Sequence, residues 1–545
     1  MQRSTLAKRA WLLFFPLAVA FYLYGLGRHP FIGPDEPRYA EVAREMFMRG
    51  DLVTPTLGGQ PWFEKPALLY WIEMLSFGAF GVSERAARFG AACAGLMAAL
   101  IIYRMGRRVE QESDGVETRW LGRSSGVALA CSIGLIGFSR GVNFDILLTL
   151  TVTAALCLFF ASGLETDEKR RRWLLAGCYV MIGASLLAKG LVGIVLPGGI
   201  VAVYLLLRRE WPDRVLRWST LWGIPLALIV AAVWYAPATA RHGWPFIDQF
   251  FIQHHFARFV SNKYHHPQPF YFYLLVLPLM VFPWTVFLAT SLCAAPRWSW
   301  RAPTASAKLR VFAFAWLVVP VVFFSFSRSK LPGYILPALP GAALLIGDQL
   351  ASALRHEDGS RAIRMTGALL FMLAVVEVIY AFHVGFIPTT CALLIATPLG
   401  VAGALILLLP HLRRMFIVLT TCAVFGASAL AINCALGQVA SRESTRDLLQ
   451  RASSRGYGAA PVFHMYTVEH TTSYYAAGRL AYGADGEPLR YDGAAEVADA
   501  ARRNGSPILV FIPKEYAAQL TEYNRIETEV IGDNGVIALV AVRAR

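Results

Sequence analysis

Charged side chains stand directly beside long apolar runs at several places in this sequence. The segment GPDEPRYAEVAREM at 33–46 follows the first such run and brings together Asp35, Arg38 and Tyr39. A cation close to a carboxylate can bind a phosphate through charge-assisted hydrogen bonds, and it can stabilise negative charge that develops during a group transfer. The segment is therefore a candidate site for chemistry on a phosphorylated substrate.

Similar residues occur at the ends of other apolar runs. The motif FEKP places Glu64 and Lys65 among aromatic residues, and the motif RGVNFD places Asp145 at the start of a later run. The other candidates are Lys189, Arg258, His265, His266, Lys330 and Tyr334. Taken singly, each is more commonly a structural or snorkelling side chain. These residues can form a single site only if the fold places them on the same side of a membrane.

The elements that must position these residues are membrane-spanning helices. Only 16% of the 545 residues are Asp, Glu, Lys or Arg, against roughly 25% in soluble domains, and the mean hydropathy is +0.48. Runs long enough to cross the hydrocarbon layer recur along the chain and predict about 13 spans. The predicted spans are 10–28, 85–107, 123–140, 143–163, 172–188, 190–208, 217–237, 270–292, 309–327, 333–351, 363–383, 386–410 and 414–434. The first run lacks a small-residue cleavage site and is expected to remain as a helix.

The loops between the spans alternate in charge. One set is rich in Arg and Lys, as in RMGRRVEQESDGVETRWLGR, ETDEKRRRW and LRREWPDRVLR, and is predicted to face the cytoplasm. The other set is predicted to face outward and comprises 29–84, the short turns SRGVNFD and LAKGL, 238–269, SRSKLPGY, HVGFIP and everything after 435. All the candidate residues belong to the second set, so the topology predicts that they gather at one membrane face. The net charge of +15 is then an orientation signal and not evidence for nucleic-acid binding.

The last part of the chain, 436–545, predicts a small α/β domain outside the membrane. Helix-like pieces such as AAEVADAARRNG alternate with the short strands PVFHMY and PILVFIP, and Asn534-Gly535 supplies the turn of a terminal hairpin. This region contains no catalytic motif, and we expect it to act as a lid or docking module. All eight cysteines lie within or at the edge of apolar runs, so no disulfide framework is expected in the aqueous parts.

The segment that begins with PDEPRY, within the first outer loop, predicts an amphipathic helix that lies in the membrane interface. Pro37 suits its first turn, with Asp35 or Glu36 as the cap, and Gly50 ends it. The other charged residues of this helix are expected to form only a solvated face: Glu41, Arg44, Glu45 and Arg49.

Three of these stretches resemble a known family. PDEPRYAEVAREMFMRGDLVTPTLGGQPWFEKPALLYW, HHPQPFYFY and SKLPGYILPALP are similar to motifs of integral-membrane glycosyltransferases with the GT-C fold, which use polyprenyl-phosphate sugars. Within that family they most resemble the bacterial transferases of 4-amino-4-deoxy-L-arabinose to lipid A. The resemblance covers the whole chain and implies a GT-C transmembrane catalytic domain at 1–435, with periplasmic loops 29–84 and 238–269. It also implies a soluble periplasmic α/β domain at 436–545.

The resemblance implies roles for individual residues. Asp35 corresponds to the essential acidic residue of the first periplasmic loop, and Asp145 resembles the second acidic residue. Lys65, together with Arg258, resembles the binder of the donor phosphate. The remaining residues expected to bind the substrates are Arg38, Tyr39, Lys189, Lys330 and Tyr334. Those that resemble a periplasmic site for a divalent metal such as zinc are Glu64, His265 and His266.

The activity implied by the resemblance is an inverting transfer of aminoarabinose from undecaprenyl phosphate to lipid A at the periplasmic face of the bacterial inner membrane. No cofactor is required for that chemistry. A phosphate monoester is already mostly anionic near pH 7 because its second pKa is about 6, so Asp35 would orient the acceptor or a cation. If the acceptor were a protein or glycan hydroxyl, Asp35 would have to act as a base. The sequence leaves open a related transferase with such an acceptor or with another polyprenyl-linked sugar.

Two other classes of function fit less well. A transporter or flippase places ionisable groups near the membrane midplane, often in repeated halves. Glu377 is the main ionisable residue within a predicted span here, and no halves repeat. A purely structural scaffold would give the Glu64-Lys65 pair and Lys330 no reason to face the same side.

Overall fold

The structure, a computed structural model, describes residues 14–113, 120–257, 268–355, 360–385, 387–409, 415–483 and 486–545. The chain forms two compact units, each built from segments that are distant in sequence. The helical unit comprises Met1–Tyr24, Phe63–Leu69 and Phe89–Ala431, and the mixed unit comprises Gly25–Trp62, Tyr70–Arg88 and Ile432–Arg545. Most of the first outer loop thus folds with the C-terminal region. The boundary at residue 435 stays a prediction about which parts can fold alone.

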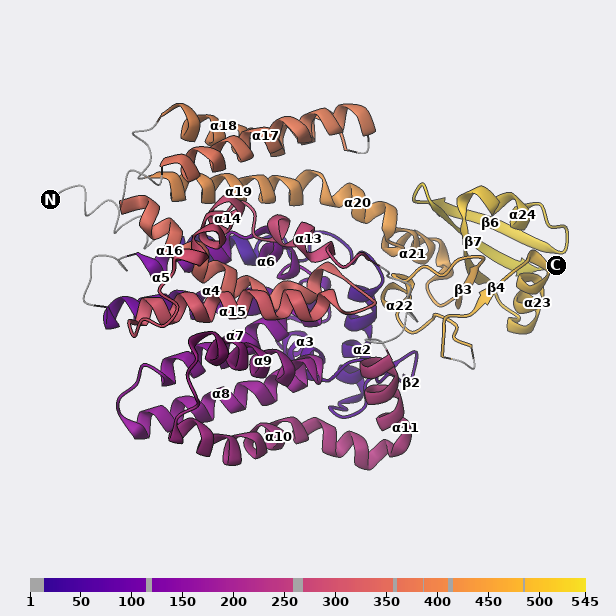
Figure 1. The fold of residues 1–545 in the computed structure, drawn as a ribbon. Helices are drawn as coiled ribbons and strands as arrows, with labels where there is room; N and C mark the ends of the chain where they lie inside the picture. Colours follow the sequence, from indigo (N-terminus) through magenta and orange to yellow (C-terminus); the bar gives the residue numbers. More distant parts are fainter. Residues whose placement is uncertain are drawn as a thin grey trace. The chain divides into compact units, whose positions relative to one another are not determined.

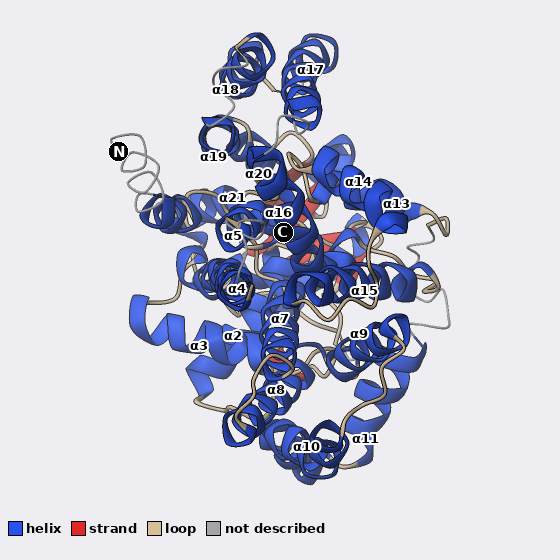
Figure 2. Ribbon diagram, turned by 60° about the vertical axis from the view of Figure 1, so that its left-hand side comes forward, coloured by secondary structure: helices blue, strands red, loops and turns tan. Residues whose placement is uncertain are grey.

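Eight helical segments of the described residues are long and apolar enough to cross a membrane. They are α4 (Glu84–Glu112), α7 (Phe144–Ser162), α10 (Arg214–His242), α15 (Ala305–Ser325), η4 (Pro332–Ala338) continued by α16 (Leu339–Arg355), α17 (Ser360–Val384), α18 (Thr389–Leu408) and α19 (Phe416–Cys434). Figure 1 shows α7 and α8 (Glu168–Lys189) among neighbouring long helices, and α8 also packs against α10. Helices make up nearly all of the helical unit, where α17 and α18 form a tightly packed pair (Figure 2). The multi-pass character predicted from hydropathy is confirmed.

The predicted number of 13 spans is not confirmed, because several predicted runs fold as short or broken helices. The pair α13 (Phe272–Met280) and α14 (Thr285–Ala294) is bent by 120°, and counting it as one span gives nine. Residues 123–140 divide into α5 (Leu121–Ala130) and α6 (Ile133–Phe138). The first turn of α8 carries the sequence EKRRR, and α9 (Val192–Arg208) is shorter than a full span. Of the predicted first span, residues Phe14–Leu23 are described and are helical.

Two outer segments predicted as loops contain helices. Within 29–84 the structure adds α3 (Leu68–Phe80), whose sequence LLYWIEMLSFGAF is apolar apart from Glu73 and Ser76. Within 238–269, α11 (Trp244–Ile247) is followed by a π-helix, η2 (Asp248–Ala257). These helices are too short to span the membrane, so a search for spans leaves their residues in the loops.

The C-terminal part of the mixed unit is an α/β fold, as predicted. Its five strands are β3 (Val462–Met465), β4 (Arg490–Tyr491), β5 (Ile508–Pro513), β6 (Ile526–Asp533) and β7 (Ile537–Ala544), in the order β4-β3-β5-β7-β6. β3 pairs in parallel with β4 and β5, whereas β7 is antiparallel to β5 and β6. Gly535 has φ +94°, which suits the turn of the predicted β6–β7 hairpin.

This sheet is buried on both faces. On β5, Ile508, Val510 and Ile512 belong to one apolar cluster, with Val497 of α23 (Ala494–Asn504). Leu509 and Phe511 belong to another, which includes Leu448 and Leu449 of α21 (Arg446–Ala452). Alternate residues of a strand point to opposite faces, so the continuous apolar sequence ILVFI matches a strand covered on both sides.

The predicted amphipathic helix is α2 (Asp35–Arg49), and it ends at Gly50 with φ +63° as expected. Its charges do not all form a solvated face, which corrects that part of the prediction. Glu41 is only 3% exposed, and Arg44 Nη2 donates to Glu41 Oε1 at 2.7 Å. Glu45 accepts hydrogen bonds from the backbone of the hairpin formed by β1 (Thr56–Leu57) and β2 (Gln60–Pro61). Among these four residues, only Arg49 is exposed.

Two cysteines at helix ends are disulfide-bonded. Cys391 lies in the first turn of α18, and Cys434 is the last residue of α19. The other cysteines are free thiols: Cys93, Cys131, Cys157, Cys178, Cys293 and Cys422. The disulfide-bonded positions are at the ends of α18 and α19 that are predicted to face outward.

Candidate active site

The helical unit brings together Asp145, Lys189 and Tyr334. The side chain of Asn143 accepts a hydrogen bond from the N–H of Ile146 at 3.0 Å, which caps α7 and places Asp145 in its first turn. Lys189 is the last residue of α8 and forms an ion pair with Asp145. Its ammonium lies 4.6 Å from the centre of the Tyr334 ring, a cation–π contact. Three separate elements thus bring a carboxylate, an ammonium and a phenol to one place.

The motif SKLPGY is fitted closely around this cluster. Lys330 is 6% exposed, and its ammonium donates to the carbonyl oxygen of Gln268 at 3.0 Å. A Cβ atom at Gly333 would lie 2.7 Å from a carboxylate oxygen of Asp145 and 2.6 Å from the Phe138 ring. Such contacts are too short for any side chain, so glycine at 333 is what lets the motif approach Asp145.

The FEKP motif is anchored by its aromatic residue. Phe63 is 3% exposed and its ring centre lies 4.8 Å from that of His242 and 5.1 Å from that of Phe246. Glu64 and Lys65 follow directly and are half-buried. Packing of Phe63 against the end of α10 and against α11 therefore holds this charged pair at the end of a span.

In the mixed unit, an ion pair holds the turn that precedes Asp35. Arg88 Nε and Nη2 donate to the two carboxylate oxygens of Glu36 at 2.9 and 2.8 Å. The same guanidinium donates to the carbonyl oxygens of Leu26, His29 and Pro30 at 2.9–3.0 Å. Both side chains are buried. This arrangement, which no local sequence pattern predicts, fixes Glu36, the residue between Asp35 and Pro37.

Asp35 itself is exposed in the mixed unit. The Arg38 guanidinium lies 5.3 Å from the centre of the Trp62 ring. Burial lowers the pKa of His470, the Arg38 guanidinium lowers it further, and the Asp35 carboxylate raises it. These three groups are therefore within electrostatic range of one another. His470 precedes α22 (Thr472–Tyr475), which packs on α2, and no sequence motif pointed to it.

The predicted site residues that remain are Tyr39, Arg258, His265 and His266. Tyr39 is 6% exposed, within α2. Arg258, His265 and His266 lie outside the described residues. Among the residues that are described, no group of three or more His, Cys, Asp or Glu side chains could hold a metal ion. Two of the three predicted metal ligands lie outside this part of the chain, so the metal site stays a prediction.

The Asp145–Lys189 pair is suited to binding an anion. The side chains of Lys189 and Asp145 are 14% and 16% exposed, so the pair lies at the edge of the packed helices and is accessible from outside. A substrate phosphate can become a second anionic partner of Lys189 while the ion pair with Asp145 holds the ammonium in place. In a group transfer, such a cation stabilises negative charge on a leaving phosphate.

The fold and the cluster define a class: a polytopic membrane protein with the GT-C fold. The crystal structure of ArnT from Cupriavidus metallidurans bound to undecaprenyl phosphate matches with a TM-score of 0.79 and 24% identity, covering 98% of each chain. The crystal structure of the same protein in the apo state matches equally. At this level of identity the match establishes the fold alone.

Sequence comparisons point to particular relatives. Residues 64–236 match the family of dolichyl-phosphate-mannose-protein mannosyltransferases. The undecaprenyl phosphate-alpha-4-amino-4-deoxy-L-arabinose arabinosyl transferase of Pseudomonas paraeruginosa is 33% identical over 379 residues, 67% of this chain and 64% of that relative. The enzyme of the same name from Edwardsiella ictaluri is 30% identical over 403 residues, 71% of this chain and 66% of that relative. The chain is a homologue of these transferases, and it spans just under two thirds of their length.

Proposed function

We propose that the protein is an inverting glycosyltransferase that moves 4-amino-4-deoxy-L-arabinose from undecaprenyl phosphate to a phosphate of lipid A. The observation that carries the proposal is the cluster of Asp145, Lys189 and Tyr334 at the ends of helices in the helical unit. That cluster can hold an anionic substrate, and it occurs in a chain homologous to transferases named for an undecaprenyl phosphate-linked aminoarabinose.

The proposed site faces the periplasm, with the protein in the bacterial inner membrane. The basic loops predicted to be cytoplasmic support this orientation. The disulfide-bonded residues Cys391 and Cys434 support it as well, because they lie at helix ends predicted to face outward. Disulfide bonds persist in oxidising compartments such as the bacterial periplasm.

In the proposed reaction, an oxygen of the acceptor phosphate attacks the anomeric carbon of the sugar. The bond from that carbon to the phosphate oxygen of the donor breaks, and the bonding electrons leave with undecaprenyl phosphate. Attack opposite the leaving group inverts the anomeric centre. Because the acceptor phosphate is already mostly anionic near pH 7, a strong base is unnecessary. The main demand is to bring two anions together and to stabilise the leaving phosphate.

Each candidate residue has a role in this scheme. Lys65 and Arg258 bind the donor phosphate, and Lys189 neutralises the negative charge that develops on undecaprenyl phosphate as its bond to the sugar breaks. Asp145 holds Lys189 in place, and Asp35 orients the acceptor or a neighbouring cation. The remaining substrate contacts come from Arg38, Tyr39, Lys330 and Tyr334. A divalent metal such as zinc at Glu64, with His265 or His266, is a separate proposal on which no step depends.

The experiment is a transfer assay with the purified protein, undecaprenyl phosphate-linked aminoarabinose and lipid A. Asp35→Ala, Asp145→Ala and Lys65→Ala should each abolish transfer while the protein still inserts in the membrane. Arg49→Ala is the control, because Arg49 is exposed on the same helix as Asp35. Absence of transfer by the unmodified protein would reject the function, and undiminished transfer by Asp35→Ala would reject the role of that residue.

The match of residues 64–236 to protein mannosyltransferases favours a second candidate, a transferase with a hydroxyl acceptor or with another polyprenyl-linked sugar. A hydroxyl must lose its proton, so Asp35 would then act as a base. Asp35→Asn, which cannot accept a proton, should then abolish transfer to a hydroxyl. Mass spectrometry of the product identifies the acceptor atom and the sugar directly.

A further inference from the structure

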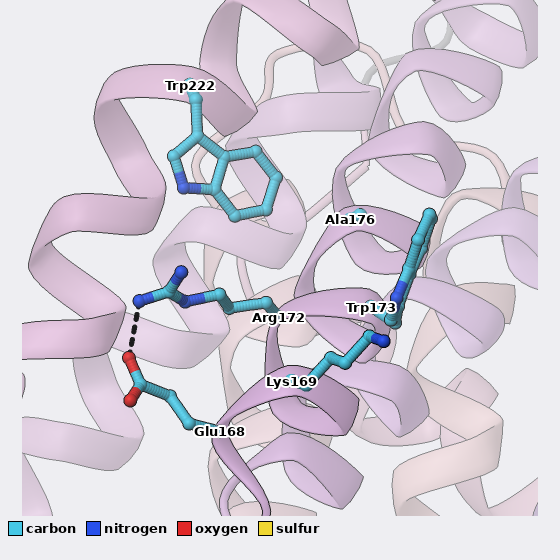
Figure 3. Close-up of a pocket in the computed structure, with 6 residues that line it drawn as sticks. All are labelled: Glu168, Lys169, Arg172, Trp173, Ala176 and Trp222. Carbon is cyan, nitrogen blue, oxygen red and sulfur yellow. Dashed lines mark hydrogen bonds and ion pairs between the residues drawn. The ribbon is translucent and has the colours of Figure 1, made fainter.

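A shallow cavity of about 550 Å³ lies between α8 and α10, at the opposite end of α8 from Lys189. It is lined by Glu168, Lys169, Arg172, Trp173, Ala176 and Trp222. Figure 3 shows Arg172 extending below the indole of Trp222, with its ion pair to Glu168, while Lys169 lies beside Trp173. The 22 residues of α8 separate the cavity from Lys189 by about 30 Å, close to the thickness of the hydrocarbon layer. The cavity therefore lies at the other membrane surface.

The charges around this cavity are not balanced. Arg170 is paired with Asp167, Arg171 with Asp213, and Arg172 with Glu168. In the part of the chain that the structure describes, the Lys169 ammonium makes no ion pair or side-chain hydrogen bond. Of the two cations that line the cavity, Arg172 has a carboxylate partner and Lys169 has none among the described residues. An anionic ligand would give the Lys169 ammonium an ion-pair partner.

The walls of the cavity are aromatic and continue into an apolar surface. Trp173 is 71% exposed and Trp222 is 39% exposed, which suits residues at a membrane interface. Ile229 and Val233 follow Trp222 at helical spacing on α10 and are 66% and 63% exposed. One stripe therefore runs from the cavity along the lipid-facing side of α10. A ligand that fits both parts has an anionic head and apolar chains.

We propose that this cavity binds the headgroup of an anionic glycerophospholipid of the cytoplasmic leaflet, with its acyl chains along the stripe on α10. Lys169 and Arg172 contact the lipid phosphate, and the two indoles flank the glycerol region. The site is separate from the proposed sugar-transfer site, because it lies at the opposite end of α8. Basic pockets between spans on the cytoplasmic side are the places where anionic headgroups bind.

The test is native mass spectrometry of the purified full-length protein, with phosphatidylglycerol or phosphatidylcholine added in detergent. The double variant Lys169→Gln/Arg172→Gln should bind one phosphatidylglycerol fewer than the unmodified protein, or bind it about 10- to 30-fold more weakly. The matched control is Arg170→Gln, because Arg170 lies on the same turn, is 77% exposed and does not line the cavity. This control should bind phosphatidylglycerol as the unmodified protein does.

Trp222→Ala keeps both cations and should also weaken phosphatidylglycerol binding. Equal binding of phosphatidylglycerol by the double variant and by Arg170→Gln would overturn the proposal. Equal retention of phosphatidylcholine and phosphatidylglycerol at this site would overturn it too. Neither result bears on the proposed sugar transfer, which the activity of the same variants reports separately.

Discussion

At the scale of single residues, the proposed chemistry depends on the charge of Lys189. Lys189→Met keeps the length of the side chain but removes the ammonium that pairs with Asp145 and contacts Tyr334. Loss of one charge-stabilising group of this kind lowers kcat by about 10²- to 10³-fold. Transfer assays at saturating donor should show this fall. The account fails if kcat stays unchanged and only the KM for the donor rises.

Gly333 offers a test of geometry without any change of charge. An alanine there would press its Cβ against the Asp145 carboxylate and the Phe138 ring. A displacement of about 1 Å at a catalytic group costs roughly 100-fold in rate. Gly333→Ala should therefore lose activity while folding normally. Gly137→Ala is the control, because a Cβ there meets no atom within 4 Å, and equal activity of the two variants would contradict the assignment.

At the scale of elements, the buried pair of Arg88 and Glu36 holds the turn before α2. Removing one partner leaves a buried charge uncompensated, which costs about 3–5 kcal/mol. Arg88→Met should thus lower the melting temperature of the purified protein and reduce its transfer activity. Arg49→Met, which removes an exposed guanidinium from α2, should change the melting temperature little. Similar melting temperatures for the two variants would show that the pair does not hold this turn.

His464 on β3 gives the C-terminal sheet a dependence on pH. The Thr472 hydroxyl donates to the carbonyl oxygen of Glu469, so His464 Nε2 donates to Thr472 Oγ1 at 3.0 Å. His464 Nδ1 is buried and has no hydrogen-bond partner in the described structure. Burial, with a smaller contribution from His470, lowers the pKa of His464 to about 4. The folded state therefore resists protonation of this ring.

The unfolded chain binds a proton at His464 below about pH 6.5, whereas the folded chain does so only near pH 4. The contribution of neutral His464 to the free energy of unfolding is therefore fully present at neutral pH. It is lost as the pH falls between these two values, and the loss is on the order of 2 kcal/mol at pH 5. Hydrogen exchange of β3 and α22, corrected for intrinsic rates, should show more opening at pH 5 than at pH 7. His464→Gln should remove this difference between pH 5 and pH 7. An unchanged difference in that variant would show that another group causes the opening at low pH.

Sequence patterns predicted most of these elements but few of the contacts between them. The apolar run at β5, the Asn534-Gly535 turn and the Gly50 terminus of α2 are local signals, and each was predicted correctly. The helix α3 was missed because its sequence is almost uniformly apolar and too short for a span. Glu36 and Arg88 are 52 residues apart, and no local pattern connects them. The residue types of Glu41 and Glu45 predict solvated side chains. Folding instead gives Glu41 a hydrogen bond from Arg44 and gives Glu45 hydrogen bonds from the β1–β2 hairpin.

At the scale of the whole molecule, the first outer loop and the C-terminal region share one compact unit. The Tyr475 hydroxyl accepts a hydrogen bond from the N–H of Phe31 at 2.7 Å, and Arg44 Nη1 donates to the carbonyl oxygen of Tyr474 at 3.0 Å. The C-terminal region therefore contacts the loop that carries Asp35. Asp145 and Lys189 belong to the helical unit.

The central claim is that this chain attaches aminoarabinose to lipid A, and the mass spectrum of lipid A tests it most directly. The protein would be produced in a strain that makes the undecaprenyl phosphate-linked sugar but lacks its own transferase. The account predicts that lipid A gains the mass of one or two aminoarabinose residues with the unmodified protein and none with Asp145→Ala. A lipid A spectrum that is identical with and without the unmodified protein would contradict it.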